Sequence, residues 1–158
     1  MKTLVVYYSR TGTTRIVADS IAKELEADIE EIKDTKSRKG PLGFVISCKD
    51  GGMKKSAKIK PPEKDPADYD LVLVGTPVWA NSMSCAVRTW LKDKKDALDK
   101  VAFFSTTRIS GIETCFRDME KEGGKAPIAT LGLIAKQVWK KQCEDKLEAF
   151  LKQLPRGE

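Results

Sequence analysis

The chain has 158 residues, of which 41% are hydrophobic and 33% charged, with a net charge of +6 at pH 7 and no histidine. This length suits a single domain over residues 1–158, and no apolar run approaches the roughly 20 residues of a membrane-spanning helix. Without histidine the chain lacks the commonest transition-metal ligand and the commonest general base, so we expect no metal site and look for chemistry supplied by a bound cofactor.

The cysteines indicate a cellular compartment for the protein, and the basic residues bear on its class of partner. The four cysteines lie far apart and form no C-x-x-C pair, which favours reduced thiols in the cytoplasm. The first residues pass directly into an apolar stretch, so we expect no secretory signal. Positive charge is spread along the chain and mixed with acids, so we expect no nucleic-acid binding, but a basic face could attract an acidic partner or an anionic substrate.

Residues 3–14 begin as an unbroken apolar run, which is typical of a buried strand, and then pass into a short loop rich in hydroxyl groups. A helical pattern follows at once, with Val17, Ile21 and Leu25 on one face. The first N–H groups of a helix have no intrahelical partners, and the helix dipole adds positive potential there. The stretch therefore predicts an anion site at a helix N-terminus.

The loop itself favours a phosphate. Hydroxyl donors stand at Ser9, Thr11, Thr13 and Thr14, and the loop contains no carboxylate. Arg10 adds charge, and Gly12 allows close backbone approach or a positive φ. The alternative is that these hydroxyls only cap the helix. No Gly-Lys-Ser/Thr, no dinucleotide glycine pattern and no nearby cysteine is present, which disfavours those phosphate-binding classes.

The middle of the chain predicts further strands and one poorly specified segment. Residues 27–33 are partly polar and indicate an edge strand. Residues 34–66 read as a basic loop, in which a short helix could start near Pro41. Residues 69–75 form the clearest buried strand after the first, and Ser82 or Ser84 can cap the helix that follows. The expected apolar stripe of that helix is Met83, Val87, Trp90 and Leu91.

The remaining elements continue the alternation of strand and helix. Residues 101–105 predict a fourth strand, followed by the loop 105–111, and residues 127–133 a fifth. The helix between them carries Ile112, Cys115, Phe116 and Met119. We expect the last helix to pack Trp139, Cys143, Leu147, Phe150, Leu151 and Leu154.

This alternation predicts an α/β fold, with a parallel sheet covered by helices on both faces. Ligands of such sheets bind at the carboxyl ends of the strands. Three loops leave those ends, at 9–14, 76–82 and 105–111, and all are rich in Ser, Thr or Asn and lack Asp and Glu. Trp79 lies in the second loop, where it could provide a flat wall for an aromatic ligand or fold back over the sheet edge.

The sequence Ser9-Arg-Thr-Gly-Thr-Thr14 after one strand, and Val74-Gly-Thr-Pro-Val-Trp79 after another, resembles the flavodoxin family over nearly the whole chain. The resemblance implies a doubly wound, five-stranded parallel sheet in the order 2-1-3-4-5, with FMN as cofactor. It implies that the first loop holds the FMN phosphate, that Trp79 stacks on the isoalloxazine, and that the other loops contact its polar edge. The implied cofactor-binding residues are Ser9, Arg10, Thr11, Gly12, Thr13, Thr14, Thr76, Pro77, Val78, Trp79, Ala80, Asn81, Ser105, Thr106, Thr107, Arg108 and Gly111.

Three features depart from the pattern of that family. The chain is basic rather than acidic, residues 105–111 contain no aromatic that could stack on the second face of the flavin, and Ala80-Asn81 stands where many members have glycine. The resemblance implies electron transfer with a redox partner protein. An FMN-dependent reductase of quinones or other small acceptors remains an alternative, as does a non-redox anion-binding module on the same scaffold. The sequence does not determine the oligomeric state.

Overall fold

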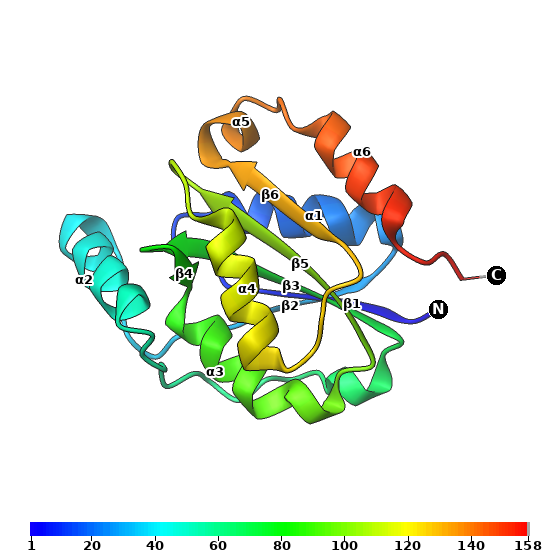
Figure 1. The fold of residues 1–158 in the computed structure, drawn as a ribbon, viewed down its shortest axis with the longest axis horizontal. Helices are drawn as coiled ribbons and strands as arrows, with labels where there is room; N and C mark the ends of the chain where they lie inside the picture. Colours follow the sequence, from blue (N-terminus) through cyan, green and yellow to red (C-terminus); the bar gives the residue numbers. More distant parts are fainter. Residues whose placement is uncertain (158) are drawn as a thin grey trace.

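A computed structural model of the chain describes residues 1–157 and shows a parallel sheet with helices on both faces (Figure 1). Its parallel strands are β1 (Thr3–Tyr7), β2 (Asp28–Glu31), β3 (Leu71–Trp79), β5 (Lys100–Thr107) and β6 (Thr130–Ile134). They lie in the order β2-β1-β3-β5-β6, which confirms the predicted doubly wound topology, with β2 at an edge. A short strand, β4 (Ser82–Met83), pairs with β3 in the antiparallel direction and was not predicted.

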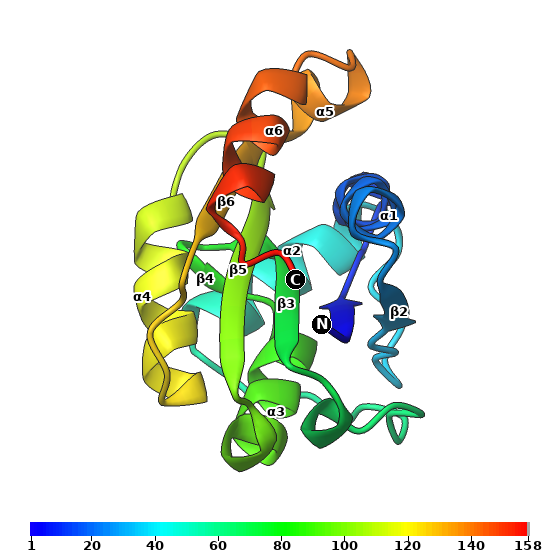
Figure 2. The ribbon, with the colours of Figure 1, turned by 90° about the vertical axis from the view of Figure 1, so that its right-hand side faces the viewer.

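Two layers of helices cover the sheet (Figure 2). The helices are α1 (Thr13–Leu25), α2 (Gly40–Gly52), α3 (Cys85–Lys94), α4 (Ile112–Gly123), α5 (Ala135–Trp139) and α6 (Glu144–Gln153), with short 3₁₀ turns at Pro66–Asp68 and Lys95–Ala97. Among the described residues, no helix is both long enough and apolar enough to span a bilayer.

The two faces of the sheet bury separate apolar clusters, as the alternation of side chains along a strand requires. On one face Val6, Val74 and Phe103 pack with Trp90 of α3 and Phe116 of α4. On the other face α1 and α6 supply Val17, Ile21 and Phe150, which pack against Leu73 and Phe104 of the sheet. Helices α1, α3 and α4 therefore face the sheet with most of the stripe that their sequence periodicity predicts.

The last part of the chain differs from the prediction. A single final helix was expected to pack Trp139 into the core, but the segment forms two helices, α5 and α6, joined by a tight connection in which Lys141 has a φ of 54°. Trp139 ends α5 and is 57% exposed. Met83 also differs, because it lies in β4 rather than on the stripe of α3, whose N-cap is Ser84.

The segment 34–66 is more ordered than its composition suggests. Instead of a basic loop with a short helix, residues Gly40–Gly52 form the thirteen-residue helix α2. It stands beside the carboxyl ends of the strands, at the left of Figure 1. Strand β3 is likewise longer than predicted, since it runs on to Trp79 instead of ending at Gly75. Both differences bear on the site that these strand ends form.

Candidate functional site

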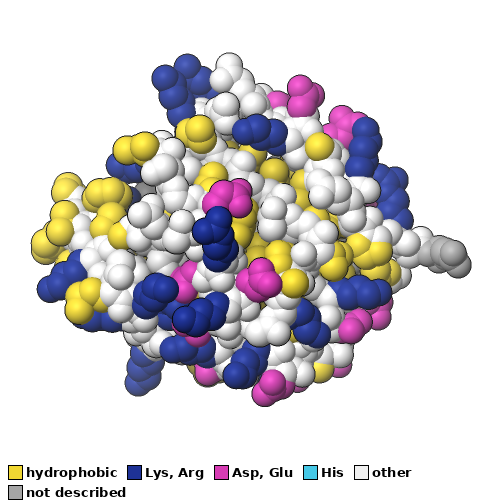
Figure 3. Space-filling model, in the orientation of Figure 1, with side chains coloured by type: hydrophobic (Ala, Val, Ile, Leu, Met, Phe, Trp, Pro, Cys, Tyr) yellow, Lys and Arg dark blue, Asp and Glu magenta, His cyan; other side chains and the backbone are white. Residues whose placement is uncertain are grey.

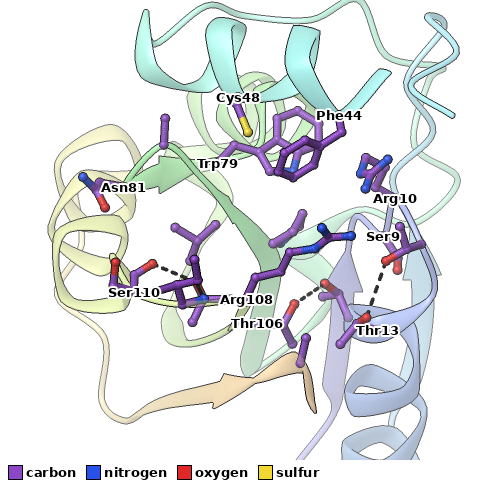
Figure 4. Close-up of a pocket in the computed structure, with 18 residues that line it drawn as sticks. Ser9, Arg10, Thr13, Phe44, Cys48, Trp79, Asn81, Thr106, Arg108 and Ser110 are labelled. Carbon is purple, nitrogen blue, oxygen red and sulfur yellow. Dashed lines mark hydrogen bonds between the residues drawn. The ribbon is translucent and has the colours of Figure 1, made fainter. Parts of the chain in front are cut away.

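A cleft of about 270 Å³ opens at the carboxyl ends of β1, β3 and β5, with α2 along one side (Figure 4). It is the place where the topology of a doubly wound sheet predicts a ligand. The cleft is lined by Ser9, Arg10, Thr11, Thr13, Thr14, Phe44, Cys48, Pro77, Val78, Trp79, Ala80, Asn81, Thr106, Thr107, Arg108, Ile109, Ser110 and Ala135. These residues include no Asp or Glu, so the charged side chains in the lining are the two arginines.

The loop between β1 and α1 presents the start of a helix to one end of this cleft. Gly12 is the N-cap of α1 and has a φ of 99°, which a residue with a Cβ adopts only with strain. The Ser9 hydroxyl accepts hydrogen bonds from the N–H groups of Gly12 (3.0 Å) and Arg15 (3.3 Å), and so holds the loop closed. The N–H groups of Thr13 and Thr14 fall in the first turn, where no preceding turn can accept them. The loop therefore offers backbone donors and hydroxyls to an anion.

Two hydrogen bonds tie this loop to distant parts of the chain. The hydroxyls of Thr14 and Thr106 lie 2.9 Å apart in a buried contact, which joins the first loop to the end of β5. The indole N–H of Trp139 donates to the Thr13 hydroxyl oxygen at 2.9 Å. An accepted hydrogen bond leaves the Thr13 proton free to point elsewhere. The loop is thus fixed from two sides while its donors stay available.

A tight hairpin forms the far end of the cleft. Ala80 and Asn81 connect β3 to β4, and both have positive φ angles, of 49° and 65°. Positive φ at both central residues is what a two-residue hairpin of type I′ requires. Asn adopts this conformation readily, whereas Ala does so at a cost on the order of 1 kcal/mol. The hairpin therefore holds a strained backbone at the edge of the cleft.

Trp79 lines the cleft but is only 4% exposed. Its ring meets the Tyr8 ring edge to face, with centroids 5.5 Å apart, and the Arg38 guanidinium lies 5.0 Å from its centroid. Burial, followed by the nearby Asp34 charge, raises the pKa of Tyr8 to about 12, so this phenol stays neutral at physiological pH. Trp79 is thus held firmly on several sides, with little of its surface left for a ligand.

A buried ion cluster fixes α2 beside the strand ends. Arg38 donates to the Asp34 carboxylate at 2.7 Å and to that of Asp50, on α2, at 3.0 Å. Burial alone would raise the pKa of Asp50, but the hydrogen bond from Arg38 and the positive charges of Lys36 and Arg38 outweigh it and hold the pKa below its ordinary value. Asp50 is therefore ionised at neutral pH and keeps α2 tied to Arg38.

A family model described as flavodoxin matches residues 2–153. The chain belongs to the flavodoxin family. Among solved structures, a flavoprotein from Lactobacillus acidophilus in complex with FMN is similar, with 25% identity, a TM-score of 0.69, and coverage of 88% of this chain and 97% of that one. Oxidised flavodoxin 2 from Bacillus cereus has 16% identity and a TM-score of 0.58, covering 98% of this chain and all of that one. The apo form of an NADH:FMN oxidoreductase has 12% identity and a TM-score of 0.56, and the match covers 99% of this chain and 92% of that one.

Most of the residues predicted for the flavodoxin site do line the cleft. The predicted residues outside the lining are Gly12, Thr76, Ser105 and Gly111. They shape the loops instead: the buried Thr76 hydroxyl accepts from the Ser84 N–H at 2.9 Å, and Gly111 is the N-cap of α4, with a φ of 96°. Ser105 is buried in β5, where its hydroxyl has no partner among the described residues.

The prediction also missed residues that the flavodoxin fold brings to the cleft. These are Phe44 and Cys48 of α2, Ile109 and Ser110 after β5, and Ala135 at the start of α5. Phe44 and Cys48 are four residues apart in a segment that follows Pro41, and this spacing on one helix face is the signal that could have revealed them. Nothing in the local sequence singles out Ala135, which lies at the cleft because the fold places the start of α5 there.

Proposed function

We propose that this protein binds FMN in the cleft and transfers electrons through it. The observation that carries the proposal is the convergence of an anion site and aromatic side chains in one cleft. The helix start at Gly12 offers donors for a phosphate, while Phe44 and Trp79 contribute apolar rings further along the lining. This donor set suits a phosphate that carries a flat ring. The similarity to a flavoprotein in complex with FMN supports the same group.

The chemistry of the reaction would belong to the flavin, which when bound can exchange one or two electrons. The protein would bind and orient it. Thr11, Thr13 and the first turn of α1 would hold the phosphate, and the backbone around Ala80 and Asn81 would face the ring. Because no carboxylate lines the cleft, the electrostatic environment of the flavin would be set mainly by Arg10 and Arg108.

We infer an acidic redox partner for this flavodoxin. Exposed apolar side chains lie on α2, where Leu42 is 72% and Val45 61% exposed, and in the cleft lining, where Ile109 is 86% exposed. Figure 3 shows yellow side chains gathered at the left, over α2, with Lys and Arg nearby. An apolar patch with a basic surround suits a partner surface that is apolar at its centre and acidic at its edge. We place both proteins in the cytoplasm, a proposal supported by the four free cysteines.

Reconstitution with FMN tests the proposal directly. We expect the purified apoprotein to bind FMN and quench its fluorescence. The double variant Thr11→Ala/Thr14→Ala should bind several kcal/mol more weakly, at about 1.5–3 kcal/mol for each lost hydrogen bond to a charged group. Ser20→Ala, which removes a hydroxyl on the exposed side of α1, should bind like the wild type. A protein that binds inorganic phosphate but not FMN would instead support the non-redox anion-binding module.

An FMN-dependent reductase of quinones is a second candidate, favoured by the lack of an aromatic residue in loop 105–111, which leaves that side of the cleft without a stacking side chain. A small neutral or anionic acceptor could approach a bound flavin from that side. Steady-state oxidation of reduced nicotinamide in the presence of a quinone separates the two functions. Turnover that depends on bound FMN would support the reductase, and electron exchange with a protein partner alone would support the carrier.

A further inference from the structure

Phe44 lies on the side of α2 that faces the cleft. It lines the cleft together with Cys48, which is one helical turn further on, whereas Leu42 and Val45 of the same helix are largely exposed. Figure 4 shows Phe44 projecting from α2 toward Arg108, which reaches across the cleft from the end of β5. An aromatic side chain, 37% exposed, therefore stands opposite the phosphate loop, from an element in which no site residue was expected.

The ring of Phe44 is covered by two guanidinium groups from the loops of the same site. The Arg108 guanidinium carbon lies 4.9 Å from the ring centroid, and that of Arg10 lies 5.3 Å away. Guanidinium groups are flat and pack on aromatic faces through cation–π attraction. Another flat π system could use the same surface. Phe44 thus offers a stacking surface inside the cleft, and in this structure arginine side chains, not backbone, occupy it.

The position of Phe44 is fixed by contacts behind it. Arg38 links Asp50 of α2 to Asp34, and its guanidinium lies 5.0 Å from the ring centroid of Trp79 in β3. The Arg38 carbonyl oxygen accepts a hydrogen bond from Arg10 at 3.3 Å. Near the end of α2, Gly51 packs so closely on Trp79 that a Cβ there would lie 2.6 Å from the Trp79 Cβ. These contacts set the separation between α2 and β3. The aromatic surface is therefore in place before a ligand enters.

We propose that Phe44 is the aromatic wall of the flavin site on the side of α2. The inference rests on the proposed function, because it needs FMN as the ligand. Loop 105–111 has no aromatic residue, and α2 supplies one from the other side of the cleft. When the flavin ring enters, Arg108 leaves the face of Phe44 and the isoalloxazine takes its place. Phe44 then slows the escape of the flavin by covering the face of the ring that lies toward α2.

Four single variants test this role through the dissociation rate and the Kd of FMN. The rate is followed as the return of flavin fluorescence after dilution of the loaded protein. We expect Phe44→Ala to bind FMN about 5- to 50-fold more weakly, mainly through faster release. Phe44→Tyr should retain wild-type binding, and Phe44→Leu, which keeps bulk without a π face, should lie between Tyr and Ala. Val45→Ala is the matched control on the exposed side of α2 and should change neither quantity.

The outcomes separate this inference from the proposed function. If the wild type binds FMN and Phe44→Ala releases it at the wild-type rate, Phe44 is no wall and the inference fails while the proposed function stands. Phe44→Leu with wild-type release would also overturn it, because bulk alone would then suffice. If the wild type binds no FMN, the proposed function itself is wrong. Comparing the Tyr and Leu variants, which change volume least, keeps the test decisive should Phe44→Ala fold poorly.

Discussion

Trp139 joins the end of α5 to the phosphate loop through a single hydrogen bond, from its indole N–H to Thr13. The ring also lies over Gly12, since a Cβ on that glycine would stand 3.9 Å from the far edge of the indole. More than half of the side chain is exposed, so packing alone does not explain its place. Its contacts indicate that it orients the Thr13 hydroxyl and covers the loop.

Replacing Trp139 with Phe removes the indole N–H and keeps an aromatic ring. Because the Thr13 hydroxyl then loses the donor that orients it, we expect FMN to bind roughly 3- to 10-fold more weakly, the loss of one ordinary hydrogen bond of about 1 kcal/mol. The free energy of unfolding should change little, since the side chain is largely exposed. Fluorescence titration and urea unfolding measure the two quantities. A large loss of stability with unchanged FMN affinity would assign Trp139 a purely structural part.

Two of the three tryptophans show how far sequence reasoning reaches for single residues. Trp90 falls on a clear helical stripe, and the structure buries it as expected. Trp139 was assigned to the core by the same kind of periodicity, but the break between α5 and α6 leaves it at the surface beside the phosphate loop. The break depends on the tight connection around Lys141, which the apolar spacing does not register. The spacing of apolar residues identifies the buried face of a helix only where the helix is continuous.

At the scale of elements, α2 shows tertiary contacts overriding local preference. Its sequence contains glycines and a proline, and it has no side-chain N-cap, so local propensity favours a loop. Tertiary contacts provide what propensity lacks, above all the ion pairs of Arg38 with Asp34 and Asp50 and the close fit of Gly51 on Trp79. The strands could be predicted from local sequence, because continuous apolar runs already indicate burial on both faces of a sheet. The sequence therefore predicted the sheet, but only a short helix near Pro41 in place of the thirteen-residue α2 that completes the site.

The ion pair between Arg38 and Asp50 makes this element sensitive to acid. The folded pKa of Asp50 is lowered, so its stabilising effect is complete above the unfolded value of about 3.9 and is lost as the pH falls through the folded pKa. We expect Asp50→Asn to cost about 1.5–3 kcal/mol at pH 7, as for a hydrogen bond to a charged group. The variant should also lose less stability than the wild type between pH 4 and about 2.

Urea unfolding of the apoprotein at several pH values provides the measurement. Asp93→Asn, on the exposed side of α3, is the matched control and should follow the wild type. Asp118 also has a lowered pKa, because its hydrogen bonds from Arg88 and Ser82 outweigh the effect of burial, so part of the acid sensitivity will remain in Asp50→Asn. Identical pH profiles for wild type and Asp50→Asn would show that Asp50 does not contribute.

At the scale of the whole molecule, the topology determines which loops form the cleft, and the charged residues nearest the cleft act most strongly on a bound ligand. The strand order β2-β1-β3-β5-β6 brings loops from distant parts of the chain to one edge of the sheet. That convergence could be predicted because alternating strands and helices allow few arrangements. The net charge of +6 is spread over the surface and screened by salt, whereas Arg10 and Arg108 stand at the cleft itself. The charges at the cleft should therefore affect the reduction potential of a bound flavin more than the net charge of the protein does.

Two variants test this distinction, one that removes a positive charge at the cleft and one that removes a positive charge far from it. Arg108→Gln removes a positive charge that stabilises electrons on a flavin in the cleft, so the reduction potential of bound FMN should become more negative. At an effective dielectric constant of about 20, the effect is about 1–3 kcal/mol, or roughly 40–120 mV for one electron, for separations of about 16 to 6 Å. Lys146→Gln, exposed on α6, lowers the net charge equally and should shift the potential far less. Potentiometric titration with redox dyes, at low and at high salt, compares the two variants. Equal shifts that vanish in high salt would mean that total charge governs the potential, and a wild-type potential in Arg108→Gln would mean that this guanidinium lies too far from the flavin to act on it.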